Sequence, residues 1–215
     1  LGLDLLLGKL DLDPEPGVDD RLRKMGETYL RLLQDSGVRL YDAPTYCLSS
    51  FATDARGCTR LNCSLGTYFD AIRTCDVLEW ELLQAMAESR EHSRHPDGLA
   101  NLPIRSYVHQ LTGAEDPVLS PRGRSAAVGI STLIVCKHEH NWVMLIGRRS
   151  SMDVALHRGL FDVIPSFMFQ PVAQDEAGEF SLIHNIYREY LEELFAIEPV
   201  PDPAAGGGHI ATDRN

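Results

Sequence analysis

Three glutamates near the C-terminal end of the chain are spaced for joint chemistry on one side of a helix. Glu189, Glu192 and Glu193 occupy positions i, i+3 and i+4, and at about 3.6 residues per turn their side chains project in similar directions. Like charges at this spacing repel each other, whereas Mg²⁺ and Mn²⁺ prefer several carboxylate and water oxygens as ligands. Arg188 precedes them and can steady one carboxylate by a charge-assisted hydrogen bond. The spacing predicts a divalent-cation site, with the solvated face of an amphipathic helix as the alternative.

A helix must carry these side chains, and the pattern predicts it from Leu182 to about Phe195. Ser181 is a suitable N-cap because its side-chain oxygen can accept a bond from a free backbone N–H. Apolar residues recur at helical spacing on the face expected to be buried, namely Ile183, Ile186, Tyr190 and Leu194. A loop that contains Gly178 and Glu179 leads into this helix.

The period of the sequence changes to two after residue 125, which indicates strands. Residues 126–136 are apolar enough on both faces for a central strand. Residues 137–141 form a polar turn, and residues 142–146 are predicted to return as the hairpin partner. A third strand is expected at 160–164, ending before Pro165.

The first 124 residues are expected to form a mixed, mainly helical region. Amphipathic spacing predicts three helices, at residues 20–35, at 77–90 and, as a short one, from Pro103. The second helix is expected to start at a capping box made by Asp76 and Glu79. Residues 42–65 read as loops or short strands because they are rich in Cys, Thr, Ser and Gly.

Composition limits the classes of partner. The 215 residues include 31 acidic and 20 basic side chains, so the net charge of −11 argues against broad nucleic-acid or anionic-membrane binding. No apolar run approaches the roughly 20 residues that a membrane-spanning helix needs, and the start of the chain lacks the basic region of a signal peptide. Five scattered cysteines favour reduced thiols over a disulfide scaffold. A cytoplasmic protein is therefore expected.

The order of strand hairpin, third strand, loop and Arg-Glu-x-x-Glu-Glu helix resembles the Nudix superfamily. The box of that family reads Gly, five residues, Glu, seven residues, Arg-Glu, an apolar residue, any residue, Glu-Glu, any residue, Gly and an apolar residue. The second half of the box is matched by Arg188, Glu189, Tyr190, Glu192, Glu193 and Ala196. The resemblance covers about residues 126–197 and does not account for the region before them.

The first half of the box departs from the family pattern. Strict spacing places Phe180 at the Glu position and Gln174 at the Gly position, whereas Glu179 and Gly178 are the nearest candidates. Phenylalanine replaces glycine at the end of the box and in the family's Pro-Gly-Gly turn, at Phe195 and Phe167. These exchanges remove the backbone freedom that glycine provides.

The resemblance implies a hydrolase in which metal-activated water attacks a phosphorus of a nucleoside diphosphate linked to another group. Glu192 and Glu193 would bind Mg²⁺ or Mn²⁺, while Glu189 would bind metal or activate the water. Arg188 would orient the Glu189 carboxylate. Glu179 would complete the set if the loop holds one extra residue.

The resemblance also implies a nucleotide-like small molecule as partner. Arg148 and Arg149, at the end of a strand, would meet its phosphates, with ordinary strand-end charges as the alternative. The alternative function is a non-catalytic Nudix-like module that senses a ligand or holds a protein partner. A homodimer is among the expected assemblies.

The expected fold is α/β (α+β), with a Nudix-like mixed sheet flanked by helices. The predicted organisation is an N-terminal region at 1–124, a Nudix-like core at 125–198 and a flexible tail at 199–215. A Nudix domain normally continues after its box helix with more strands and a second helix. Either the chain is a truncated fragment, or an N-terminal element takes the missing place.

Overall fold

A computed structural model describes residues 2–12, 17–37, 40–91, 102–148, 160–172 and 175–197. The fold is mixed α/β, as the sequence predicts. The helices are η1 (Gly2–Leu6, 3-10), α1 (Asp20–Asp35), α2 (Tyr68–Ala71), η2 (Ile72–Asp76, π), α3 (Val77–Glu91), α4 (Pro103–Thr112) and α5 (Leu182–Phe195). The strands are β1 (Leu7–Asp11), β2 (Pro44–Thr53), β3 (Thr59–Thr67), β4 (Gly129–Ser131), β5 (Val135–His138), β6 (Asn141–Met144), β7 (Ile146–Arg148), β8 (Phe161–Val163) and β9 (Ser166–Met168).

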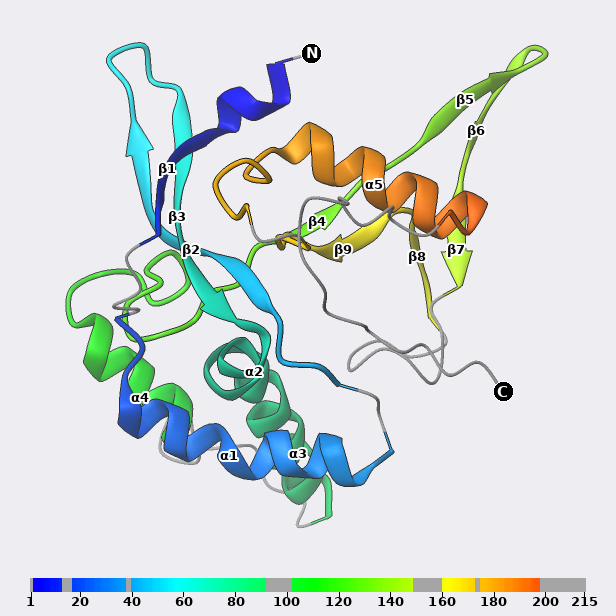
Figure 1. The fold of residues 1–215 in the computed structure, drawn as a ribbon. Helices are drawn as coiled ribbons and strands as arrows, with labels where there is room; N and C mark the ends of the chain where they lie inside the picture. The colour runs from blue at the N-terminus through cyan, green and yellow to red at the C-terminus, as the bar shows by residue number, and fades with distance from the viewer. Residues whose placement is uncertain are drawn as a thin grey trace.

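The N-terminal region is a three-stranded sheet packed on helices (Figure 1). The strand order is β1-β3-β2, with β2 and β3 antiparallel and β1 parallel to β3. Helices α1, α3 and α4 lie together on the opposite side of this region from the tip of the β2–β3 hairpin. A buried cluster joins them, made of Leu22, Tyr29, Leu30, Ile72, Val77, Ile104 and Val108.

The β2–β3 hairpin corrects the expectation of loops or short strands at 42–65. Two long strands are joined by a turn in which Asp54 Oδ1 accepts the N–H groups of Arg56 and Cys58, at 2.9 and 3.0 Å. Small polar side chains had hidden the strands, since Ser, Thr and Cys weaken the alternation that marks a half-buried strand.

The capping box predicted at Asp76 is wrong. Helix runs without a break from Tyr68 through the π-helical turn into α3, and Thr67 is the N-cap, its side chain accepting the N–H of Asp70 at 3.3 Å. Asp76 therefore lies inside the helix. Asp76 and Glu79 have the spacing of a capping box, but both lie inside a continuous helix, where no free backbone N–H groups need a cap.

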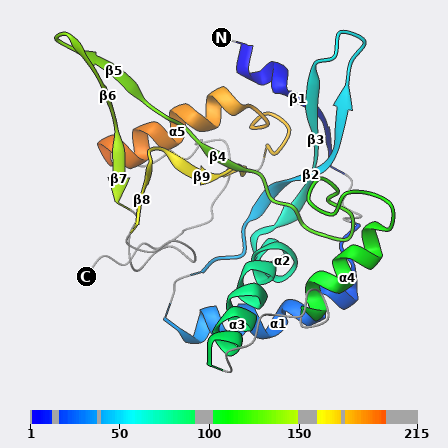
Figure 2. The ribbon, with the colours of Figure 1, turned by 180° about the vertical axis from the view of Figure 1, so that it is seen from behind.

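The C-terminal region consists of short strands. Strands that follow one another along the chain, separated by one to three residues, pair with different partner strands. β4 pairs with β9, β5 with β6, and β7 with β8, all antiparallel. In the described residues these are three separate two-stranded pairings rather than the single mixed sheet expected. Helix α5 lies alongside β4 and β9 in both views (Figures 1 and 2).

The continuous strand predicted at 126–136 is divided at residues 132–134. The N–H of Thr132 donates to the carbonyl of Pro165 at 2.9 Å, and only β5 forms the hairpin with β6. The strand expected at 160–164 is confirmed as β8, but β9 follows Pro165 at once. The Ile164–Pro165 peptide bond is cis.

The two regions meet along the outer edge of β2. Tyr46 donates its N–H to the carbonyl of Phe169 at 3.0 Å, and its own carbonyl accepts the N–H of Val128 at 2.9 Å. A second buried cluster spans this edge and contains Leu7, Tyr46, Cys63, Phe169 and Leu182. The predicted boundary near residue 124 stays a prediction, and residues from both sides of it share this core.

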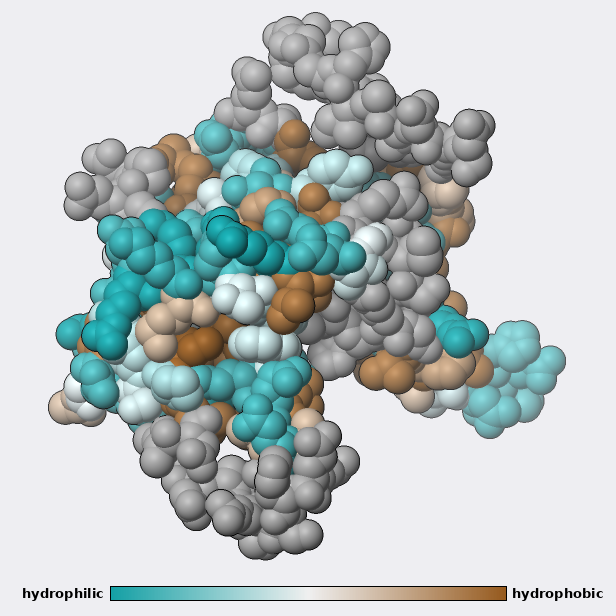
Figure 3. All heavy atoms as spheres, turned by 90° about the horizontal axis from the view of Figure 1, so that it is seen from below, coloured by the Kyte–Doolittle hydropathy of each residue, from teal (hydrophilic) through white to brown (hydrophobic). Residues whose placement is uncertain are grey.

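The β5–β6 hairpin extends away from the rest of the molecule as an arm (Figures 1 and 2). All eight of its strand residues are exposed, including Trp142 at 71%. Seen from below, the arm has hydrophobic side chains near its base and a hydrophilic tip (Figure 3). Among the described residues, no helix is both long and apolar enough to cross a bilayer.

Candidate functional site

The helix that carries the glutamates forms as predicted. α5 spans Leu182–Phe195, and the Ser181 hydroxyl caps it by accepting the N–H of His184 at 3.2 Å. The buried face is only partly as expected. Leu182 and Asn185 are the residues of α5 that are fully buried, whereas the four apolar residues predicted to be buried are half-buried: Ile183, Ile186, Tyr190 and Leu194.

Arg188 lies at the centre of the site, with 8% of its side chain exposed. Its guanidinium forms ion pairs with Glu179 at 3.1 Å, with Glu189 at 3.2 Å and with Glu192 at 3.7 Å. We call these four residues the Arg188 cluster. One buried cation thus joins three carboxylates, two from the helix and one from the preceding loop.

Asn185 and backbone carbonyls complete the surroundings of Arg188. The guanidinium donates to Asn185 Oδ1 at 2.8 Å and to the carbonyl of Gln170 at 3.2 Å. The Asn185 amide nitrogen donates in turn to the carbonyls of Glu179 and Ser181, both at 2.9 Å. The segment that follows β9, the loop and the first turns of α5 are therefore joined by hydrogen bonds. Asn185 was not among the predicted site residues. A polar side chain on the buried face of a helix, one turn after the N-cap, does however indicate a residue with buried hydrogen-bond partners.

Glu179 contacts Arg188 although it stands one position before the strict box spacing. Its Oε2 atom also accepts the N–H of Val172 at 3.0 Å, and the residue is buried. The extra loop residue invoked at the sequence level is thus compatible with the observed contact. Phe180, at the strict position, packs instead against Tyr46 and Phe169 with ring centroids 5.1 and 5.6 Å away.

Tyr46 supports the loop from the N-terminal sheet. Its hydroxyl donates to the carbonyl of Glu176 at 2.6 Å, and its ring lies 4.4 Å from that of Phe169. Burial, reinforced by the charge of Glu179, raises the pKa of Tyr46 above its ordinary value. The tyrosine therefore stays a neutral donor. No feature of the sequence pattern had marked it.

The helix carboxylates are held in an environment that disfavours their charge. Burial raises the pKa of Glu189, against the opposing effect of Arg188. Burial also raises the pKa of Glu192, and the neighbouring Glu189 and Glu193 add to the shift. A further positive charge beside them would relieve this cost.

Two buried atoms in the cluster have no hydrogen-bond partner among the described residues. They are Arg188 Nε and Glu192 Oε1, which lie 3.7 Å apart and so form an ion pair without a hydrogen bond. Glu193 leans toward β9, where its Oε1 accepts the N–H of Ser166 at a long 3.4 Å. The adjacent glutamates thus have different surroundings.

The predicted metal ligands are near one another, but Arg188 lies among them. Within the described part of the chain, no three His, Cys, Asp or Glu side chains are arranged to hold a metal ion. The basic residues expected to meet phosphates are not both described. Arg148 ends β7, is exposed and pairs with Phe161, while Arg149 lies outside the described residues.

No protein-family model matches this chain, and no curated protein matches it either. The Nudix resemblance consequently rests on the box residues of the sequence and stays a prediction.

Proposed function

We propose that this protein is a Nudix-like, Mg²⁺- or Mn²⁺-dependent hydrolase of a nucleoside diphosphate linked to another group. The observation that supports it best is the position of Arg188 between Glu179 and Glu189. That contact unites the displaced first half of the box with its intact second half. A solvated helix face would leave the arginine exposed rather than 8% accessible.

Carboxylate oxygens are the ligands that a hard divalent cation prefers. Glu192 Oε1 is buried and has no hydrogen-bond partner in the part of the chain that the structure describes, and burial raises the pKa of both Glu189 and Glu192. Glu192 and Glu193 would hold the ion. When bound, such an ion supplies Lewis acidity and lowers the pKa of a coordinated water.

Residues of the chain would orient the catalytic carboxylate and accept the proton of the attacking water. Arg188 orients Glu189 by the 3.2 Å ion pair, and Glu179 fixes Arg188 from the loop. Glu189, with its raised pKa, takes the proton of the attacking water, since a base works best when its pKa approaches the working pH. The water oxygen forms a bond to phosphorus, and the phosphoanhydride oxygen on the other side leaves.

The direct test is a thermal melt during Mg²⁺ and Mn²⁺ titration, followed by an assay of phosphate-ester release from nucleoside diphosphate sugars. Specific binding raises the melting temperature by mass action. The wild type should respond, and the Glu192→Gln/Glu193→Gln variant should not. Glu139→Gln, at the tip of the arm, removes one carboxylate far from the cluster in sequence and is the matched control. An equal response of all three proteins, or hydrolysis that survives in the double variant, contradicts the proposal.

The second candidate is a non-catalytic Nudix-like module. It is favoured by Arg188, which occupies the space among the carboxylates, and by Phe167, which is half-buried in β9 where the family carries glycine. In that case neither metal raises the melting temperature. A nucleotide that stabilises the wild type without being hydrolysed would then identify a sensing role.

A further inference from the structure

A cavity of about 670 Å³ opens between the β2–β3 hairpin and the loop at residues 115–125. We call it the hairpin cavity. Its lining residues come from β2, β3, the loop and the start of the segment before α1, and none belongs to the Arg188 cluster. Its volume lies within the range of roughly 300–1,000 Å³ typical of small-molecule sites. The cavity is therefore a candidate site independent of the proposed hydrolase function.

The floor of the hairpin cavity is made of small side chains held at fixed positions. A Cβ atom on Gly66 would lie 2.6 Å from Cys47 Sγ and 2.7 Å from Ser125 Oγ, so only glycine permits this approach of the loop to the sheet. Cys47 Sγ and Ser125 Oγ are 3.2 Å apart. The N–H of Ser125 donates to Thr74 Oγ1 at 2.9 Å, which anchors the loop on the π-helical turn.

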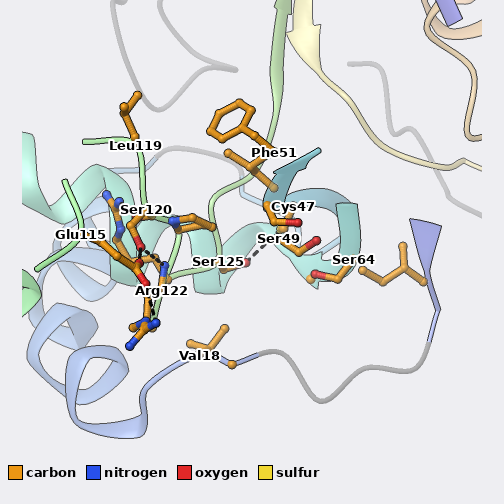
Figure 4. Close-up of a pocket in the computed structure, with 18 of the residues that line it drawn as sticks. Val18, Cys47, Ser49, Phe51, Ser64, Glu115, Leu119, Ser120, Arg122 and Ser125 are labelled. Carbon is orange, nitrogen blue, oxygen red and sulfur yellow. Dashed lines mark hydrogen bonds and ion pairs between the residues drawn. The ribbon is translucent and has the colours of Figure 1, made fainter. Parts of the chain in front are cut away.

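The facing wall is a network of polar side chains within the loop. Arg122 pairs with Glu115 at 2.5 Å, and the hydroxyl of Ser120 donates to the second oxygen of the same carboxylate. Figure 4 shows these three side chains on one side of the cavity, with Ser49 and Ser64 on the other side. Donors and acceptors thus face each other across the open space.

The charges of the lining cancel. Two carboxylates, of Glu115 and Asp116, stand against two guanidinium groups, of Arg122 and Arg124, and the remaining polar side chains are mainly serine hydroxyls. Such a lining gives neither anions nor cations a Coulombic advantage. A hydroxyl both donates and accepts, so it complements a ligand that has hydroxyls of its own.

The rim adds an apolar surface. Phe51 and Leu119 stand at the mouth of the cavity, 46% and 60% exposed (Figure 4). A sugar ring presents C–H groups on one face and hydroxyls around its edge. It therefore matches an aromatic rim above a floor and wall of hydroxyl, carboxylate and guanidinium groups.

We propose that the hairpin cavity binds a neutral sugar ring through its neighbouring hydroxyls. Ser49 and Ser64 contact the hydroxyls from the sheet side, Glu115 and Arg122 from the loop side, and Phe51 covers the C–H face. The ring is that of a free monosaccharide or the ribose of a nucleoside, because both carry hydroxyls on neighbouring ring carbons.

Isothermal titration calorimetry of the full chain in EDTA tests this with D-glucose, D-ribose, adenosine and 2′,3′-dideoxyadenosine. We expect saturable binding of at least one hydroxyl-bearing probe, with a dissociation constant in about the millimolar range. Binding of a monosaccharide identifies a free sugar as the source, and binding of adenosine alone identifies a nucleoside. Dideoxyadenosine should bind at least about tenfold more weakly than adenosine, as expected when site groups lose their partners. No binding by any probe, or equal binding of the two nucleosides where adenosine binds, overturns the proposal.

A cavity-filling variant assigns any binding to this cavity. Ser49→Phe places a large side chain on the sheet side and should weaken the binding of the active probe at least about tenfold. Thr53→Phe introduces the same phenyl side chain further along β2, outside the lining, and should bind like the wild type. Circular dichroism and a melt without ligand check that both variants fold. Because no metal or phosphate is present, the result is independent of hydrolysis, and binding unchanged in Ser49→Phe contradicts the assignment.

Discussion

Arg188 is a buried cation that forms ion pairs with three carboxylates, and one terminal nitrogen of its guanidinium donates to the Asn185 amide oxygen and to the Gln170 carbonyl. Burying an ion is costly unless its partners stay in place. The loop carboxylate of Glu179 is buried with it, at 11% exposure. The loss of the arginine would therefore leave negative charge without compensation inside the protein.

We predict that Arg188→Met lowers the free energy of unfolding by about 3–5 kcal/mol, the usual cost of breaking a buried ion pair from one side. Urea denaturation at neutral pH measures this. The loss should shrink in acid, where protonated carboxylates no longer need the arginine. The matched control is Arg31→Met, which breaks an exposed i,i+4 pair with Glu27 and should cost less than about 1 kcal/mol. Equal losses in the two variants would refute the central role of Arg188.

The residues of the site were largely visible in the sequence, but their arrangement was not. Glu189, Glu192 and Glu193 share a helix as their spacing requires, because helical geometry is local. The pairing of Glu179 with Arg188 depends on the shape of the loop, which fixed spacing cannot represent. Asn185 gains its role only from the carbonyls that surround it.

At the scale of elements, the π-helical turn η2 sets how closely two helices approach. Gly26 of α1 packs directly on the backbone of Arg73, where an added Cβ would overlap the carbonyl oxygen. Thr74 in the same turn accepts a hydrogen bond from Ser125 in the loop beneath the hairpin cavity. Helix packing and cavity shape therefore depend on one short segment.

Gly26→Ala should destabilise the protein by about 1–3 kcal/mol, because overpacking must displace backbone rather than a flexible side chain. Gly129→Ala is the control, since its Cβ would meet no atom within 4 Å. Thermal melts of both variants report the difference. If Gly26→Ala is as stable as Gly129→Ala, the close contact does not constrain the two helices.

Asp76 links stability to pH. Burial raises its pKa to about 6, and Glu79 adds to the shift. The folded protein then holds the proton more tightly than the unfolded chain, so stability falls as pH rises from about 4 to about 6. Asp76→Asn, which stays neutral, should raise the unfolding free energy by roughly 3 kcal/mol at about pH 7 and leave it unchanged below about pH 4. Urea denaturation of both proteins at the two pH values measures this difference. An equal gain in unfolding free energy at both pH values would exclude the charge of the Asp76 carboxylate as its cause.

Strands were less predictable than helices for a physical reason. α1 and α5 carry apolar residues at helical spacing and side-chain caps, all of which are local signals. The runs at 129–138 and 161–168 change partner at their breaks, and a partner is chosen by segments far away in the chain. Alternation along one run cannot specify such an exchange.

For the whole molecule, the shared core around Tyr46 and Phe169 ties the N-terminal sheet to the α5 region. Both residues are fully buried, and their rings are in contact. A core that takes residues from both sides favours cooperative unfolding over independent melting of two domains.

Phe169→Ala should cost about 3–5 kcal/mol and should lower the protection of α1 and α5 together. Hydrogen–deuterium exchange in increasing urea measures both helices in one experiment. Val118→Ala, at an 84% exposed residue, is the control and should change neither the unfolding free energy nor the protection of the two helices. If α5 loses protection while α1 keeps it, the two regions unfold separately.

The exposed arm offers a place to modify the protein. Its turn at Glu139 and His140 joins strands that bury none of their side chains, so a longer connection there adds mainly loop-closure entropy, about 0.6 kcal/mol for each doubling of loop length. An inserted epitope or fluorophore would stand clear of both the Arg188 cluster and the hairpin cavity. Surface immobilisation through the arm would leave both sites open to solution.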